Sequence, residues 1–109
     1  MGKPLTGEVV VLPFPQTDLQ VGKRRPALVV ANLTGDDLIL CQITSRTRAD
    51  DYSVSLSSDD FEQGRLNVES FIRCNRLFTV DRSVILYKAA TITTAKLSEV
   101  RAVIRDLFA

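Results

Sequence analysis

The feature that most constrains the fold of this chain is a pair of apolar runs separated by a short polar turn. Residues 27–31 and 38–43 consist mostly of Ala, Val, Leu and Ile, and Gly35-Asp36-Asp37 lies between them. A nearly continuous apolar run such as 27–31 is typical of a strand that is buried on both faces. The turn signal predicts that the two runs pair as an antiparallel hairpin. Pro26 suits the start of the first strand, because its nitrogen carries no hydrogen for the ladder.

Further strands are predicted where β-branched residues cluster or where apolar residues alternate with polar ones. These segments cover residues 7–14, 52–56, 70–78 and 84–89. Residues 57–64 instead indicate a short helical turn or a loop, with Ser57 or Ser58 as its cap. Residues 15–24 are mainly polar, and a loop of about ten residues is long enough in a compact domain to suggest a function.

The C-terminal segment changes from a strand period to a helical one. Its apolar residues recur at helical spacing at Leu97, Val100, Ile104 and Leu107. We expect Ser98 to cap this helix and Leu97 to form a hydrophobic staple with Ala102. The sequence therefore predicts one domain over residues 1–109. Its class is mainly β (α+β), with five to seven strands and one terminal helix.

Composition excludes several functional classes. The chain has two cysteines and no histidine, and Cys41 and Cys74 each lie within an apolar run. Such cysteines indicate buried, reduced thiols in a cytoplasmic protein rather than a disulfide or a zinc site. The carboxylates form no convergent set for Mg²⁺, so we expect neither a metal nor another cofactor. No segment approaches the roughly 20 apolar residues that cross a membrane, and residues 1–4 do not resemble a secretory signal.

The balance of charge is close to neutral. The chain has 14 Lys and Arg residues and 13 Asp and Glu residues, which gives a formal net charge of +1. Binding to nucleic acid would therefore require the charges to be separated on the surface. Basic residues gather in 23–25, 46–48 and 73–82, whereas many acidic residues fall between Asp50 and Glu69. Charge alone still favours an ordinary mixed surface.

Two short motifs are more specific. In residues 22–30, Gly-Lys-Arg-Arg-Pro-Ala-Leu-Val-Val, a basic cluster leads into a β-branched strand. Residues 42–45, Gln-Ile-Thr-Ser, end another strand with two hydroxyls. Together with residues 7–9, 54–56 and 70–81, they occur in an order and spacing that resemble the PemK/MazF toxin family over most of the chain. The resemblance implies an SH3-like β-barrel with a C-terminal α-helix, a fold that is also found in CcdB.

The resemblance also implies a function. Members of the family are toxins of bacterial type II toxin–antitoxin systems, cleave single-stranded RNA without a metal, form homodimers and are held inactive by a cognate antitoxin. Metal-free RNA cleavage uses the ribose 2′-OH as nucleophile and leaves a 2′,3′-cyclic phosphate and a 5′-OH. The reaction needs one group that accepts the 2′-OH proton, one that stabilises the charged phosphorane, and one that protonates the leaving oxygen.

Three residues are candidates for this chemistry. Arg25 would bind the phosphate and protonate the leaving group, because a guanidinium fork can bind two phosphate oxygens. Thr44 would donate a hydrogen bond in the transition state, and Arg73 is the third candidate. For RNA binding we expect Lys23, Arg24, Ser45, Arg46, Asn75 and Arg76. The alternative for each is structural, namely a solvated charge or a polar group that satisfies nearby backbone groups.

The proton acceptor is missing from its expected position. In one branch of the family a strand reads Arg-Cys-Asp and its aspartate is the base, whereas residues 73–75 of this chain read Arg-Cys-Asn. An amide does not accept a proton near neutral pH. The chain therefore either relies on the Arg25 and Thr44 pair of the other branch or is slow or inactive. Asp18 in the polar loop is the candidate replacement, although an aspartate in a turn more often bonds its own backbone.

Two other functions stay open. Asn75 is compatible with a homologue that binds RNA without cutting it, in which substitution of Arg25 would only weaken binding. A CcdB-like inhibitor of DNA gyrase shares the fold but depends on a C-terminal Trp-Gly-Ile. This chain ends Asp-Leu-Phe-Ala and contains no tryptophan. A groove for proline-rich peptides is disfavoured, because such grooves are lined with aromatic side chains and only 6% of the residues are aromatic.

Overall fold

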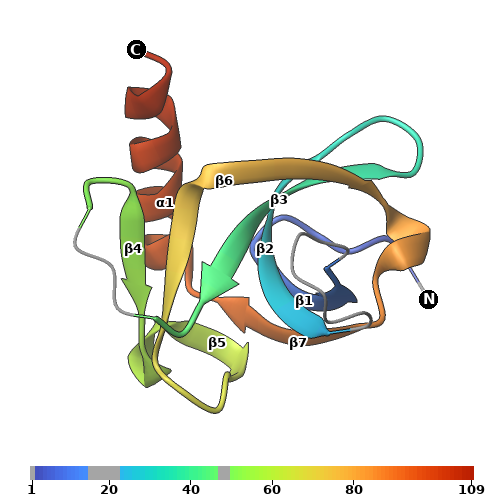
Figure 1. Ribbon diagram of the computed structural model, residues 1–109, viewed down its shortest axis with the longest axis horizontal. Helices are drawn as coiled ribbons and strands as arrows, with labels where there is room; N and C mark the ends of the chain where they lie inside the picture. The colour runs from blue at the N-terminus through green and yellow to red at the C-terminus, as the bar shows by residue number, and fades with distance from the viewer. Residues whose placement is uncertain (1, 15–22, 47–49) are drawn as a thin grey trace.

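The computed structural model describes residues 2–14, 23–46 and 50–109, which form an antiparallel sheet and one α-helix (Figure 1). The strands are β1 (Glu8–Pro13), β2 (Arg24–Asn32), β3 (Asp37–Thr44), β4 (Ser53–Leu56), β5 (Phe61–Gly64), β6 (Ser70–Asp81) and β7 (Tyr87–Ile92). Their order in the sheet is β4-β6-β3-β2-β1-β7-β5. The sheet curls into a half-barrel with helix α1 (Thr94–Leu107) beside it. The predicted mainly β fold with a C-terminal helix is confirmed.

Both faces of the central strands are buried, which explains their apolar runs. The face toward α1 is formed by a cluster that includes Val9, Leu28, Cys41, Ile72 and Val100. The opposite face lines the half-barrel with Val10, Leu12, Ala27, Val29, Leu38 and Leu40. Successive residues of one strand therefore enter different clusters, as the alternation of side chains requires. The prediction that the strand at 27–31 is covered on both faces is confirmed, and so is its hairpin with β3.

Strand β6 bends where it passes from β4 to the first half of β3 (Figure 1). Leu77 lies opposite Cys41, but the next residue of β3, Gln42, lies opposite Arg73. Residues 74–76 therefore form an irregular stretch without partners in β3. Within this stretch the backbone N–H of Cys74 donates a hydrogen bond to the carbonyl oxygen of Tyr52, at 3.0 Å. The bend lets one long strand pair with β4 along its first part and follow β3 along its whole length.

The two cysteines meet on the face of the sheet that packs against α1. Both are free thiols with buried side chains. A hydrogen bond with Cys74 and burial together raise the pKa of the Cys41 thiol far above its ordinary value. Because the thiolate is the reactive form of cysteine, Cys41 stays a protonated thiol near neutral pH. The prediction that both cysteines are buried is confirmed.

Strand β5 differs from the sequence prediction of a helical turn or loop over residues 57–64. Only the 3₁₀ turn η1 (Ser58–Asp60) is helical, and Ser57 precedes it as the cap residue. The Asp60 carboxylate accepts a hydrogen bond from the Ser57 backbone N–H, at 2.8 Å. Residues 61–64 pair with β7. This strand carries largely exposed polar side chains and shows no hydrophobic alternation. It is a strand because it pairs with β7, which the sequence pattern does not reveal.

The last strand is displaced from its predicted position at 84–89. The 3₁₀ turn η2 (Arg82–Val84) occupies the start of that segment, and β7 begins at Tyr87. The Asp81 side chain caps η2 by accepting a hydrogen bond from the Ser83 backbone N–H, at 2.8 Å. The hydrogen bond to the Asp81 side chain therefore favours a turn at the start of this segment, although its residue types favour a strand.

Helix α1 begins earlier than predicted. Its cap is Thr93, whose Oγ1 accepts a hydrogen bond from the Lys96 backbone N–H at 3.1 Å. Ser98 lies inside the helix, so the predicted Ser98 cap is wrong, and a staple from Leu97 is excluded for the same reason. The first turn is fixed by ion pairs of Lys96 Nζ with Asp60, at 3.6 Å, and with Glu99, at 3.0 Å. An apolar stripe therefore cannot reveal where this helix starts.

No helix within the described residues is long and apolar enough to span a membrane.

Gly64 lies where β5 approaches β7 most closely. Its φ angle is +67°, and a Cβ atom there would lie 2.4 Å from the carbonyl oxygen of Ala89. Both the backbone angle and the contact require glycine. Gly35, in the β2–β3 turn, also has a positive φ of +80°, but a Cβ atom there would meet nothing within 4 Å. Substitutions at these two glycines therefore allow the cost of backbone strain to be distinguished from the cost of steric overlap.

We predict that Gly64→Ala lowers the free energy of unfolding by about 3 kcal/mol, because it combines left-handed strain with overlap against backbone. Gly35→Ala should lower it by about 1 kcal/mol through strain alone. Urea denaturation of the two variants beside the parent protein measures both values. Equal losses would show that β5 can move away from β7 without cost.

Candidate functional site

The strand register brings the three candidate catalytic side chains to one face of the sheet. Gln42 in β3 lies opposite Ala27 in β2 and opposite Arg73 in β6. Side chains alternate between faces along a strand. Thr44 lies two residues after Gln42 in β3, and Arg25 lies two residues before Ala27 in β2. Both side chains therefore share the face of Gln42. All three candidate side chains are half-buried.

Thr44 is the last residue of β3, and its side chain has a local partner. Its Oγ1 accepts a hydrogen bond from the Arg46 backbone N–H, at 3.2 Å. This contact is the structural role that the sequence analysis weighed against catalysis. A threonine hydroxyl is also a donor, and the bond from Arg46 uses only a lone pair of its oxygen. Thr44 can therefore keep this contact and still donate a hydrogen bond to a phosphate oxygen.

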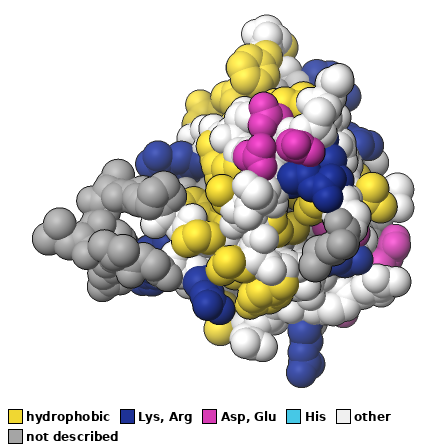
Figure 2. All heavy atoms as spheres, turned by 90° about the vertical axis from the view of Figure 1, so that its right-hand side faces the viewer, with side chains coloured by type: hydrophobic (Ala, Val, Ile, Leu, Met, Phe, Trp, Pro, Cys, Tyr) yellow, Lys and Arg dark blue, Asp and Glu magenta, His cyan; other side chains and the backbone are white. Residues whose placement is uncertain are grey.

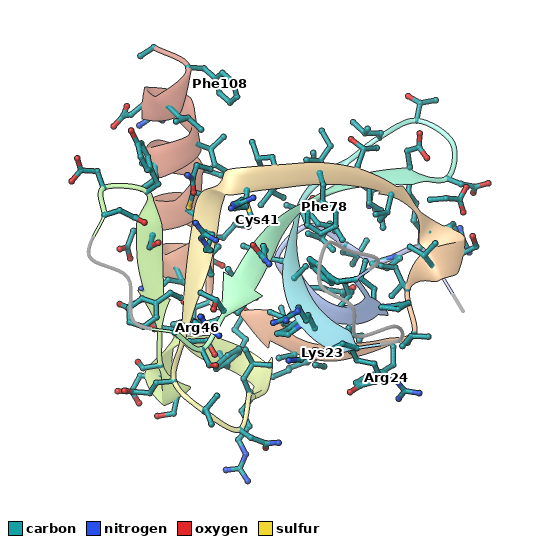
Figure 3. The ribbon with its side chains drawn as sticks, viewed as in Figure 1. Lys23, Arg24, Cys41, Arg46, Phe78 and Phe108 are labelled. Atoms are coloured by element: carbon teal, nitrogen blue, oxygen red, sulfur yellow. The ribbon has the colours of Figure 1, made fainter. Side chains whose placement is uncertain are left out.

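Four of the predicted RNA-binding residues gather at one end of the half-barrel. Lys23 and Arg24 lie at the start of β2, and Ser45 and Arg46 directly follow β3. Because β2 and β3 are antiparallel, the start of one strand adjoins the end of the other. The four side chains are exposed, and Figure 3 shows Lys23, Arg24 and Arg46 along the lower side of the barrel. Two motifs that are distant in sequence thus form one basic edge.

The remaining predicted residues lie in β6 and in the first polar loop. Asn75 and Arg76 are exposed and belong to the irregular stretch of β6, directly after Arg73. Asp18, the candidate proton acceptor, lies outside the described residues, so its position relative to Arg25 is not part of this geometry. The described residues bring together no three acidic or cysteine side chains that could hold a metal ion.

Asp50 is a further acidic residue of the site, and sequence reasoning missed it. Its Oδ1 accepts a hydrogen bond from the Tyr52 backbone N–H, at 2.9 Å. This bond and the attraction of the Arg73 guanidinium hold the pKa of Asp50 below its usual value. Asp50 therefore carries a negative charge at neutral pH. No local pattern marks it, because pairing of β4 with β6 is what brings it toward Arg73.

Sequence comparison identifies one family. Residues 5–108 match the sequence profile of the PemK-like, MazF-like toxins of type II toxin–antitoxin systems. No curated protein sequence matches the chain.

Solved structures share the fold over nearly the whole chain. A crystal structure of MazF from Deinococcus radiodurans has a TM-score of 0.78 at 28% identity, covering 99% of this chain and 98% of that one. A MazE–MazF structure from the same organism has a TM-score of 0.78 at 27% identity, covering 98% and 97%. An endoribonuclease from a mycobacterial species, at 17% identity and a TM-score of 0.76, covers 99% and 93% and shows similarity of fold.

We predict that Arg73→Gln raises the pKa of Asp50, because the substitution removes a positive charge that favours the carboxylate. The pKa should stay below the ordinary value of an aspartate, since the Tyr52 hydrogen bond persists. NMR titration of the Asp50 carboxyl carbon measures the shift. Arg76→Gln removes the same charge nearby and should leave the pKa unchanged. An equal rise in both variants would mean that Asp50 senses only the net charge of β6.

Proposed function

Because the chain belongs to the PemK-like, MazF-like toxins of type II toxin–antitoxin systems, we propose that it is an endoribonuclease that cleaves single-stranded RNA. The observation that carries this proposal is the common face of Arg25, Thr44 and Arg73. Two guanidinium groups and a hydroxyl on one surface suit a phosphodiester whose charge grows during the reaction. The proposed reaction is metal-independent attack of the 2′-OH, which leaves a 2′,3′-cyclic phosphate and a 5′-OH.

Each candidate has a distinct role in this reaction. Arg25 binds the scissile phosphate through two oxygens and protonates the leaving 5′ oxygen. Thr44 donates a hydrogen bond to a phosphorane oxygen, and Arg73 balances the added negative charge. The basic edge formed by Lys23, Arg24, Ser45 and Arg46 holds the flanking RNA backbone.

The proton acceptor comes from an aspartate outside β6, because Asn75 cannot serve. Asp18 is the candidate from the first polar loop. Asp50 is the second candidate, since it is ionised at neutral pH and interacts electrostatically with Arg73. An ionised carboxylate is ready to accept the 2′-OH proton as the phosphorane forms. The Asp18→Asn and Asp50→Asn variants identify which of the two is used.

The cognate antitoxin is the proposed protein partner, and the bacterial cytoplasm the proposed compartment. The MazF of Deinococcus radiodurans has been crystallised with MazE. In this chain the exposed basic edge offers a site for an acidic, disordered antitoxin segment, which would compete with RNA for the same charges. The buried thiols of Cys41 and Cys74 suit a reducing compartment.

We predict that the purified protein cuts a long single-stranded RNA in excess EDTA into fragments with 5′-OH ends. Arg25→Ala should reduce the cleavage rate by about a hundredfold to a thousandfold, because it removes a charged donor from the transition state. Arg101→Ala, which removes an exposed charge from α1, is the matched control and should cleave at the parent rate. Cleavage by Arg25→Ala at the control rate would exclude Arg25 from the chemistry.

A catalytically silent RNA-binding homologue is the second candidate function, and Asn75 is the observation that favours it. In that case the parent protein leaves the RNA intact in the same assay, while Arg25→Ala still weakens RNA binding. Asn75→Asp restores a carboxylate beside Arg73 and would then produce cleavage.

A homodimer is also proposed, from the family and from exposed apolar surface. Figure 2 shows hydrophobic side chains on the face at the right of Figure 1, where η2 lies. Val84 and Leu86, in and directly after η2, are 40% and 44% exposed. Neighbouring apolar side chains with this exposure are suited to contact a second subunit.

We predict that Leu86→Asp shifts the protein from dimer to monomer, because it places a charge in an apolar contact. Sedimentation velocity at several protein concentrations measures the change. Val68→Asp introduces the same charge at a 59% exposed position between β5 and β6 and should keep the parent's oligomeric state. A dimer that survives Leu86→Asp would place the subunit contact on another face.

A further inference from the structure

A basic hollow adjoins Arg25 and is lined by further residues to which no role has been given. Its volume is about 450 Å³, within the range of small-ligand sites. It lies between the start of β2, the start of β7 and the segment that follows β5. The polar lining residues are Arg24, Arg25, Arg65, Asn67, Tyr87 and Lys88.

Four of these lining residues are cations. Lys88 is paired with Glu8, with its Nζ 3.0 Å from Glu8 Oε2, so the positive charge of Lys88 is balanced. Arg24 and Arg65 approach the hollow from β2 and from the segment after β5, and both are exposed. The hollow therefore carries an excess of positive charge, which favours an anionic ligand.

Two neutral side chains, Tyr87 and Asn67, give the hollow groups that could contact a base as well as a phosphate. The Tyr87 side chain lines it and is 47% exposed, so its ring is accessible for stacking. A base of a single strand stacks well on an exposed aromatic ring. Asn67 adds an amide, which can donate to and accept from the edge of a base. An aromatic ring, an amide and guanidinium groups together match the base and the phosphate of a nucleotide.

Arg25 connects this hollow to the proposed chemistry. It lines the hollow, and it also shares the face of Thr44 and Arg73. Its neighbour Arg24 points to the opposite side of the strand, because successive side chains alternate. Figure 3 shows Arg24 on the lower side of the barrel, near β7. Because Arg25 itself lines the hollow, a strand of RNA whose phosphate is held by Arg25 would have its next nucleotide there.

We propose that the hollow binds a nucleotide next to the scissile phosphate, with Tyr87 stacking on its base and Arg24 and Arg65 holding its phosphate. The inference rests on the proposed endoribonuclease function and adds a subsite that contributes to the choice of cleavage sequence. An acidic peptide would also be attracted by the charge, but it would make no use of the ring and the amide. These two side chains favour the nucleotide.

The position of Arg65 depends on the close packing of β5 against β7. Gly64 precedes it, with Gly64 paired to Ala90, and Ala89 lines the hollow on the β7 side. The positive φ of Gly64 directs the chain out of β5 into the segment that carries Arg65 and Asn67. The hollow is thus built next to two paired strands.

The test uses a labelled 2′-O-methyl RNA of about ten nucleotides, a length within the usual range of single-strand sites. This probe lacks the 2′-OH nucleophile, so its dissociation constant reports binding without cleavage. Fluorescence anisotropy at several salt concentrations gives the dissociation constant and its salt slope. The variants are Arg65→Ala, Tyr87→Ala and Tyr87→Phe, with Arg101→Ala on α1 as the matched control for charge. Urea unfolding confirms that each variant is folded.

The subsite predicts two different signatures. Arg65→Ala should weaken binding severalfold and reduce the steepness of the log–log salt dependence by about 0.7, the value of one phosphate contact on a single strand. Tyr87→Ala should weaken binding about tenfold with an unchanged salt slope, because stacking is not an ionic contact. Tyr87→Phe, which keeps the ring, should bind like the parent. A fold defect at Tyr87 would affect both Tyr87 variants, so the phenylalanine variant distinguishes stacking from stability.

The proposal and the proposed function fail in different ways. If the parent cleaves RNA in EDTA but Arg65→Ala and Tyr87→Ala both bind the probe like Arg101→Ala, the subsite is overturned and the function stands. If the parent does not cleave but shows both signatures, nucleotide binding in the hollow stands and the nuclease function is overturned. If Arg65→Ala weakens binding of a polyglutamate peptide but not of the probe, the hollow is a peptide site and the nucleotide proposal is overturned.

Discussion

The register of β2, β3 and β6 is the constraint on which the rest of the structure depends. Both faces of these strands are covered, one by the cluster toward α1 and the other by the lining of the half-barrel. A slip by one residue would exchange the two sets of side chains, and neither set would fit its new neighbours. The same register brings Arg25, Thr44 and Arg73 to one face. Packing of the core and alignment of the site are therefore one requirement.

Much of the fold could be predicted because local sequence patterns indicate it. The apolar runs at 27–31 and 38–43 predict the central hairpin, and the helical spacing near the C-terminus predicts α1. The errors occur where a pairing partner or a single side-chain bond decides the outcome. Strand β5 exists because β7 pairs with it, and α1 begins at Thr93 because that hydroxyl caps the first turn. Neither contact has a periodic signature in the sequence.

The candidate site could be predicted only in part, for a related reason. Arg25 and Thr44 follow from motifs that resemble the family, and the register explains why residues so far apart in sequence share a surface. Asp50 and Arg65 follow from no motif. Asp50 is brought toward Arg73 by the pairing of β4 with β6, and Arg65 is brought to the hollow by the pairing of β5 with β7. Single charged residues brought together by tertiary structure leave no trace in composition or spacing.

The adjacency of Arg24 and Arg25 on β2 has a consequence for how such a protein can diverge. Successive side chains of a strand face opposite sides, so these two neighbouring residues can take separate roles although both line the hollow. In the proposed function, Arg25 on the Thr44 side takes part in the reaction, whereas Arg24 binds the nucleotide in the hollow. These proposed roles would let substitutions around Arg24 change the preferred target sequence while the reacting surface is inherited intact.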